Sequence, residues 1–147
     1  MTETEIISVD RVVHAPLQKI FDLLADPRQH PVIDGSGTVR KTQGSAPARL
    51  SLGSSFGMDM KMGVPYKITN EVVEFIEGKQ IAWCHFGGHV WRYILEPMDG
   101  GTKVTEQFDY MHSRSKLMLK VMGSLPKNKK SMRNTLEHLE KHFSSKQ

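Results

Sequence analysis

The chain has 147 residues, of which 38% are hydrophobic and 24% charged, and its formal net charge is +4 at neutral pH. This length and balance predict one soluble globular domain, residues 1–147, with a core large enough to fold unaided. No apolar run reaches the length of a transmembrane span, the polar and acidic N-terminus is no signal peptide, and the single cysteine, Cys84, excludes an internal disulfide. Together these features predict a cytoplasmic protein.

The positive net charge raises the question of a nucleic-acid partner. Lysine and arginine concentrate towards the C-terminus, where Lys127, Lys129 and Lys130 form the one tight cluster. No RNA-recognition motif, zinc finger or paired aromatic platform accompanies them. We interpret the cluster as a solvated helix face and expect no nucleic-acid partner.

The N-terminal part reads as a strand followed by two short helices. Residues 5–13 alternate between apolar and polar and predict a strand with one buried face. Pro16 suits the first position of a helix, where no backbone N–H is needed, and this helix is expected to end before Pro27. A second brief helix is expected over residues 28–33, and glycines 35 and 37 turn the chain towards the next strand.

Six more strands are predicted from alternation, from β-branched and aromatic residues, and from the turns between them. They span residues 38–44, 54–63, 66–76, 80–86, 90–96 and 102–112. The last five are joined by short turns, such as Glu77-Gly78-Lys79 and Gly87-Gly88. This pattern indicates a meander of sequential antiparallel strands.

Residues 115–146 form the only long segment with a sustained helical pattern. Met132, Leu136 and Leu139 repeat at spacings of three or four and so share one helix face, which must be buried against a partner. The predicted sheet is that partner. Gly123 and Pro126 interrupt the pattern, so we expect either a kink or two helices.

This order of elements resembles that of the START-like (Bet v 1-like) superfamily. Residues 12–16, Val-Val-His-Ala-Pro, and residues 20–27, Ile-Phe-Asp-Leu-Leu-Ala-Asp-Pro, are similar to its bacterial polyketide cyclase/dehydrase branch, also called SRPBCC proteins. The loop over residues 30–37 resembles actinobacterial members, and residues 77–83 and 101–105 lie where such chains place their hairpins. The resemblance covers nearly the whole chain.

The resemblance implies an α+β helix-grip fold. In this fold a curved antiparallel seven-stranded sheet wraps around a long C-terminal helix, two short helices lie between strands one and two, and a cavity lies between sheet and helix. Family members bind lipids, sterols, quinones, aromatic polyketides or other apolar ligands, and some catalyse cyclisation or dehydration in the cavity. Others act on partner proteins.

Because a fold with many functions does not select one, three functions stay open. The first is a binding module that carries or senses a small hydrophobic or aromatic ligand, such as a lipid, polyketide or quinone-like molecule. The second is an enzyme of the cyclase/dehydratase kind that uses a cavity carboxylate or histidine. The third is a protein-interaction module, such as a component of a regulatory or toxin–antitoxin pair, and a homodimer is equally open.

The expected lining of the cavity is apolar. In the strand over residues 54–63 the apolar side chains alternate with Gly57, Asp59 and Lys61, so they share one face. Methionines make such a face adaptable, and ligand pockets are mostly apolar. The alternative is a core that these flexible side chains pack solid. The predicted ligand-binding residues are Phe56, Met58, Met60, Met62, Trp91, Tyr93, Phe108, Tyr110, Met118 and Met122.

Three polar residues are the candidates for catalysis. Glu106 alternates in phase with Phe108; on an inner face its pKa would rise and suit a general acid or base, whereas at the rim it would reach solvent. His30 and Asp34 fall in the loop at the expected cavity mouth, where a histidine could relay a proton with the carboxylate orienting it. Asp34 could equally only stabilise the turn at Gly35. The sequence does not show any two converging, so binding ranks above catalysis.

Neither a metal nor a cofactor is expected. His138 and His142 are four residues apart, a spacing that permits two ligands on one helix face. However, no carboxylate follows the pattern of a known zinc motif. Cys84 has no neighbouring base in the sequence, which argues against a nucleophile.

Overall fold

The computed structural model describes residues 6–35, 39–42, 47–62, 64–84, 89–110 and 124–144. Seven strands form one antiparallel sheet in the order β1-β7-β6-β5-β4-β3-β2. The strands are β1 (Ile6–Val13), β2 (Val39–Thr42), β3 (Ser55–Met62), β4 (Val64–Ile76), β5 (Gln80–Cys84), β6 (Val90–Met98) and β7 (Gly101–Asp109). The helices are α1 (Leu17–Leu24), the short 3-10 helix η1 (Pro27–Gln29), α2 (His30–Ile33) and α4 (Ser124–Ser144).

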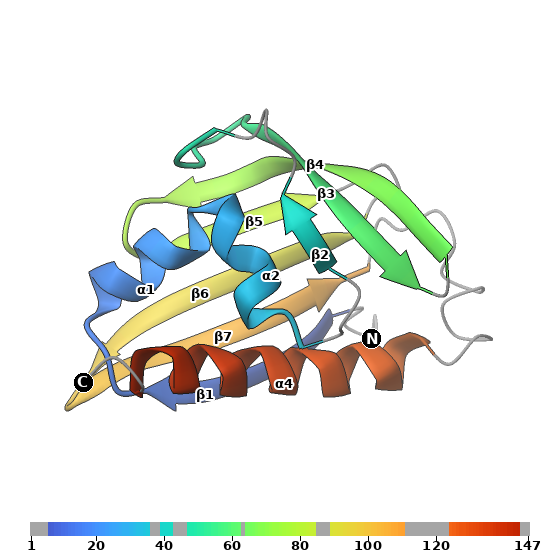
Figure 1. Cartoon of the computed structure of the whole chain (residues 1–147). Helices are drawn as coiled ribbons and strands as arrows, with labels where there is room; N and C mark the ends of the chain where they lie inside the picture. Colours follow the sequence, from blue (N-terminus) through green and yellow to red (C-terminus); the bar gives the residue numbers. More distant parts are fainter. Residues whose placement is uncertain are drawn as a thin grey trace, which may run out of the picture.

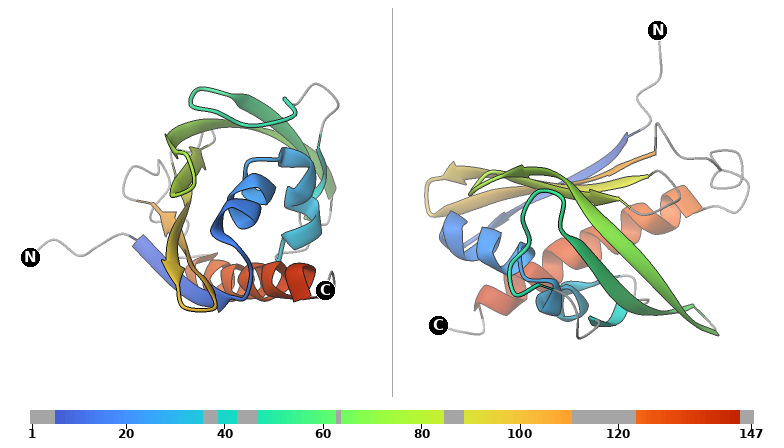
Figure 2. Two further views of the ribbon diagram at one scale, coloured as in Figure 1. Left: turned by 90° about the vertical axis from the view of Figure 1, so that its left-hand side faces the viewer. Right: turned by 90° about the horizontal axis from the view of Figure 1, so that it is seen from above.

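The sheet curls, and the helices occupy its concave side (Figures 1 and 2). The α1 and α2 helices lie within the curl, and α4 runs along its open side. The closure is made by α4 packing against β1 and β7, and by α2, which contacts both α4 and the edge strand β2. This arrangement is a helix-grip, and the predicted fold class is confirmed.

The predicted strands are confirmed in order, and their bounds differ by a few residues. Strand β6 continues through Pro97, beyond the predicted end at residue 96, because Pro97 pairs with Thr102 next to the turn at Gly100. Strand β5 pairs with β6 only as far as Ile94, so Pro97 has a neighbouring strand on one side only. Proline is tolerated at such a position because no ladder hydrogen bond is lost.

The C-terminal helix buries the predicted stripe. Met132, Leu136 and Leu139 are each at most 1% exposed. Pro126 falls in the first turn of α4, where its missing N–H leaves no intrahelical bond unmade. Residues 111–123, with Met118, Met122 and Gly123, lie outside the described residues, so the predicted kink stays a prediction.

The α1 helix fills one end of the concave side. Its apolar residues, Ile20, Phe21, Leu23 and Leu24, are buried. The helix begins one residue later than predicted, at Leu17, and Pro16 is its N-cap with an extended backbone. None of the described helices is both long enough and apolar enough to cross a membrane.

The loop after α2 is fastened to α4 at Gly35. The Gly35 N–H donates to Thr135 Oγ1 at 2.8 Å, and the Asn134 amide donates to the Gly35 carbonyl at 3.4 Å. A Cβ atom at position 35 would collide with the backbone of Ser131 and Thr135. Only glycine lets the loop come this close, so Gly35 fixes the distance between loop and helix.

Replacing Gly35 with alanine is expected to destabilise the fold by about 2 kcal/mol, because backbone must move to admit the methyl group. Urea denaturation would measure the loss. Gly53→Ala is the matched control, since Gly53 has open space around it and a positive φ of 85°; it should cost about 1 kcal/mol from strain alone. Equal losses in the two variants would contradict a steric role for Gly35.

Candidate functional site

The candidate site lies on the concave face of the sheet. All the predicted lining residues whose side chains are described belong to this face. Four are at most 5% exposed: Phe56, Met58, Tyr93 and Phe108. Three more are partly buried against the same core: Met60, Trp91 and Tyr110. The Met62 side chain and residues Met118 and Met122 lie outside the described part, so the expectations for them stay predictions.

The strand register places a carboxyl in the middle of this apolar face. Glu106 of β7 lies directly across from Tyr93 of β6 and from Val9 of β1. Phe108, two residues further along β7, lies across from Trp91, with their ring centroids 4.5 Å apart. Directly opposed side chains on one face of a sheet are within contact distance. Glu106 is therefore surrounded by aromatic and aliphatic groups.

Glu106 is buried, with 3% of its surface exposed, so the expectation that it reaches solvent at the rim is wrong. Burial raises the pKa of the carboxyl well above its usual 4.5; a hydrogen bond with the Tyr93 hydroxyl opposes this, and the charge of Asp34 adds to it. Among the described residues, Glu106 Oε1 has no hydrogen-bond partner. Glu106 thus keeps its proton to higher pH than an exposed glutamate, and one of its oxygens is left without a partner from the described part of the chain.

Tyr93 supplies the second polar group. Burial raises the pKa of its hydroxyl well above 10, and the neighbouring Glu106 raises it further through its charge and their hydrogen bond. The hydroxyl therefore stays protonated and available as a donor. Asp34, at the C-cap of α2, also acts on both pKa values by its charge. Glu106 and Tyr93 thus form a bonded polar pair on the inner face of the sheet.

His30 lies in the wall of the interior rather than at an open mouth. It is the first residue of α2, and its Nε2 lies 2.9 Å from the Leu24 carbonyl oxygen. Its ring stacks on the Trp83 ring, with the ring centroids 4.6 Å apart, and meets the Phe56 ring edge-on, with the centroids 5.4 Å apart. Burial lowers the pKa of His30 to about 4, although the Leu24 carbonyl and the charges of Asp26 and Asp34 oppose this. Near neutral pH the ring is uncharged and donates its Nε2–H to Leu24.

Sequence reasoning missed Trp83. This residue lies on β5 and is 8% exposed. Its ring stacks on the His30 ring, and its ring centroid lies 5.7 Å from that of Phe56 and 5.6 Å from that of Tyr93. A usable signal was present, because Ile81 and Trp83 alternate within the predicted strand in the same way as the residues chosen on β6. The rule that selected Tyr93 selects Trp83 too.

On the outer face of the same strands, charged side chains form ion pairs. Arg92, next to Tyr93 in sequence, points outwards and pairs with Glu74 at 2.7 Å and with Asp109 at 3.4 Å. Its guanidinium also donates to Gln107 at 3.0 Å. The bond from Arg92 lowers the pKa of Glu74. Glu74 and Asp109 therefore share a cationic partner, whereas no cationic group within the described ranges lies within ion-pair distance of Glu106 on the inner face.

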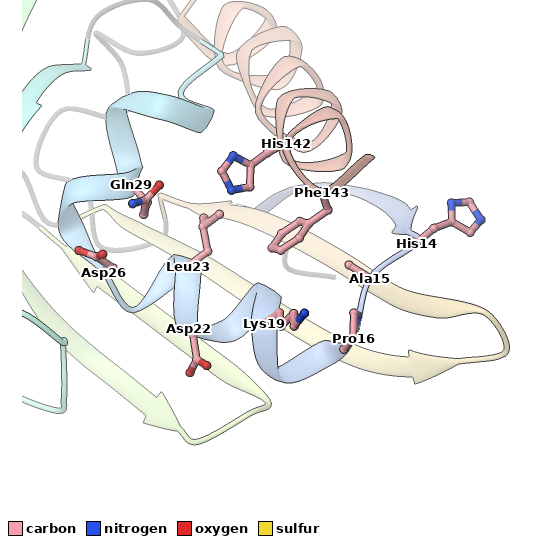
Figure 3. Close-up of a pocket in the computed structure, with 10 residues that line it drawn as sticks. All are labelled: His14, Ala15, Pro16, Lys19, Asp22, Leu23, Asp26, Gln29, His142 and Phe143. Atoms are coloured by element: carbon pink, nitrogen blue, oxygen red, sulfur yellow. The ribbon is translucent and has the colours of Figure 1, made fainter. Parts of the chain in front are cut away.

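A separate surface pocket of about 590 Å³ lies between α1 and the C-terminal end of α4 (Figure 3). None of the predicted site residues lines it. Its lining residues are His14, Ala15, Pro16, Lys19, Asp22, Leu23, Asp26, Gln29, His142 and Phe143.

Metal and thiol chemistry find little support among the described residues. No group of three or more His, Cys, Asp or Glu side chains within the described ranges is arranged to hold a metal ion. Burial, with a smaller effect from Glu71, raises the pKa of the Cys84 thiol, so little reactive thiolate forms.

No protein-family model matches the chain. Two curated relatives come from Mycobacterium tuberculosis: uncharacterized protein Rv0088 is 44% identical over 100 residues, and uncharacterized protein MT0096 is 43% identical over 100 residues. Each match covers 67% of this chain but only 44% of the relative. The chain therefore spans less than half the length of the curated relatives it matches.

Several solved structures share the architecture over nearly the whole chain. Protein Ms6760 from Mycobacterium smegmatis has a TM-score of 0.75 at 18% identity and covers 98% of this chain and 94% of its own. The Aha1 dimer from Colwellia psychrerythraea has a TM-score of 0.65 at 17% identity, covering 92% of both chains. The AHSA1-like protein from Aeromonas hydrophila has a TM-score of 0.67 at 14% identity, covering 93% of both. These likenesses concern the fold alone, which these proteins share with the helix-grip described above.

Proposed function

We propose that the chain binds a small hydrophobic or aromatic molecule in its interior, between the sheet and the C-terminal helix, as a cytoplasmic carrier or sensor. The observation that carries the proposal is Glu106, a carboxyl enclosed by apolar side chains whose Oε1 has no hydrogen-bond partner among the described residues. A buried polar atom left in this state costs about 1–3 kcal/mol. A ligand with one polar group beside Glu106 would remove that cost.

The surroundings of Glu106 indicate what kind of ligand would fit. Aromatic rings from Trp83, Tyr93 and Phe108 offer flat surfaces, and Met58 and Met60 on β3 offer adaptable ones. Tyr93 and Glu106 supply two polar groups that lie together on this face. These features suit a mostly apolar molecule with a hydroxyl, carbonyl or similar group at one end, such as a lipid, a polyketide or a quinone-like compound.

Acid–base catalysis in the same interior is the second candidate. It is favoured by one observation, the adjacency of Glu106 and Tyr93, because two polar groups could meet one ligand atom. A protonated Glu106 would donate its proton to a leaving hydroxyl, so that the C–O bond breaks and water departs. The resulting carboxylate would accept the proton of the neighbouring carbon, whose C–H electron pair forms the new double bond. A dehydratase of this kind would return a ligand that has lost one molecule of water.

Native mass spectrometry of the protein purified from its own host, followed by extraction of bound molecules, tests the proposal. We expect an apolar molecule in stoichiometric amount, and its mass after incubation with fresh protein would distinguish a carrier from a dehydratase. An empty protein whose thermal midpoint is unmoved by fatty acids, quinones and polyketides would contradict both. That result would favour a partner protein or a homodimer instead.

The variant Met60→Trp is expected to fill the interior and abolish retention of the ligand while the fold stays close to its native stability. Lys61→Trp is the matched control, because Lys61 is exposed on the opposite face of the same strand and should leave retention unchanged. Mass spectrometry and thermal melting would report the two properties separately. If Met60→Trp unfolds the protein instead, the interior was already packed solid.

A further inference from the structure

The surface pocket beside the end of α4 has an apolar floor (Figure 3). Leu23 and Ala15 are buried beneath it, and the Phe143 ring packs partly against the same core. Its volume, about 590 Å³, falls in the range of small-molecule sites. The pocket is thus large enough for a small molecule and combines apolar with polar lining residues, and the polar ones decide which ligand suits it.

Both carboxylates of the rim already have partners. Asp22 lies 2.9 Å from the Arg49 guanidinium and accepts a bond from the Gln18 amide, and these contacts hold its pKa below the usual value. Figure 3 shows the Asp22 carboxylate pointing away from Leu23. Asp26 accepts the backbone N–H of Arg28 at 3.0 Å and lies 3.8 Å from its guanidinium. Neither arginine lines the pocket, so the acids are neutralised from outside it.

Lys19 leaves a positive charge at the rim. It lies four residues before Leu23 on α1, so both share the helix face that lines the pocket. Among the described residues, no carboxylate lies within ion-pair distance of its ammonium group. His14 and His142 also line the pocket.

Two helix ends near the pocket carry partial charges of opposite sign. The positive end of α1 begins at Leu17, and its N-cap residue, Pro16, provides no side-chain cap. The negative end of α4 lies on the other side, where His142 belongs to the last turn. A negative group is therefore best placed on the α1 side, next to Lys19, with an apolar body over Leu23 and Phe143.

From this geometry we propose that the pocket is a second binding site, separate from the interior, for a small amphipathic anion. The ligand class is a carboxylate attached to an aromatic or branched aliphatic body. The carboxylate pairs with the Lys19 ammonium, and the body covers Leu23 and the Phe143 ring.

Naphthalene-1-carboxylate is a suitable probe, with 1-naphthylmethylammonium as its matched cation. We expect the carboxylate to bind about tenfold more tightly than the ammonium compound, since an ion pair at a partly exposed site supplies a modest preference. Amide shifts in the NMR spectrum of the whole chain should concentrate at Lys19, Gln29 and His142. Shifts centred on Tyr93 and Glu106 would place the probe in the interior and overturn the proposal.

Variants of one lysine complete the test. Lys19→Gln should weaken binding of naphthalene-1-carboxylate about fivefold, and Lys19→Glu should reverse the preference in favour of the ammonium compound. Lys129→Gln is the control, because Lys129 is exposed on α4 and does not line the pocket. Equal affinities for Lys19→Gln and Lys129→Gln, or no preference between the two probes, would overturn the proposal.

Discussion

Lowering the pH from about 6.5 to about 4 is expected to remove about 3 kcal/mol of folding free energy through His30 alone. The pKa of His30 is lowered from 6.5 to about 4 in the folded chain, chiefly by burial. Between about pH 6.5 and about pH 4, His30 therefore binds a proton in the unfolded chain but stays neutral in the folded chain. The loss begins near pH 6.5 and is complete near pH 4, in the direction set by a depressed histidine pKa.

The variant His30→Gln isolates this effect in urea denaturation at several pH values. Glutamine can still donate to the Leu24 carbonyl, but it cannot stack on Trp83, so the variant should be less stable than the natural chain near neutral pH. The difference in free energy of unfolding between the natural chain and His30→Gln should shrink by about 3 kcal/mol towards pH 4, because the variant has no histidine to protonate at this position. His14→Gln, a change at an exposed histidine, is the control. A gap that stays constant with pH would mean that His30 is accessible to protons and not enclosed.

The sheet and the long helix were predictable because the signals for them are local. Alternation within each strand sets which side chains share a face, and short turns set which strands are neighbours. Phe56, Tyr93 and Phe108 were placed correctly by this reasoning, and Trp83 could have been. Alternation also gave Glu106 the same face as Phe108, but the state of its carboxyl depends on what lies opposite. Only the register with Tyr93 and Val9 determines that.

What escaped prediction depends on contacts between distant parts of the chain. Gly35 reads as a turn residue, yet its close approach to α4 is set by Thr135, one hundred positions later. His30 reads as a loop residue near a cavity mouth, whereas the packing of α2 against Trp83 encloses it. The pocket at the end of α4 joins residues 14–29 with His142 and Phe143. No local pattern connects such segments, because tertiary packing brings them together.

Two glutamates on opposite faces of the sheet show why residue type alone does not set charge state. Glu74 on the outer face meets Arg92, which lowers its pKa, so its contribution to stability is present at neutral pH and is lost as the pH falls. Glu106 on the inner face has a pKa raised by burial. The folded chain then holds a proton that the unfolded chain releases, so stability is full at acid pH and is lost as the pH rises.

Glu106→Gln is therefore expected to become progressively more stable than the natural chain as the pH rises above about 4.5, by up to about 1.4 kcal/mol per pH unit until the folded pKa is reached. Glutamine has nearly the same shape and can accept the Tyr93 hydroxyl bond, but it cannot ionise. Glu74→Gln is the matched control with the opposite sign, since it should be destabilised near neutral pH and recover towards acid. Urea denaturation from about pH 3 to about pH 9 would measure both slopes, because the stability difference of Glu74→Gln changes below about pH 4.5 and that of Glu106→Gln changes above it.

The pH dependence of stability in Glu106→Gln and Glu74→Gln also tests the proposed function. A rising advantage for Glu106→Gln, with the opposite trend for Glu74→Gln, would mean that the interior is dry and holds a neutral carboxyl ready to bond a ligand. Adding the co-purified molecule should then reduce the advantage, because the ligand stabilises the natural carboxyl through its unused oxygen. If the two variants behave alike, Glu106 is ionised and solvated in the folded chain. The interior would then lack the enclosed polar anchor on which the binding proposal rests.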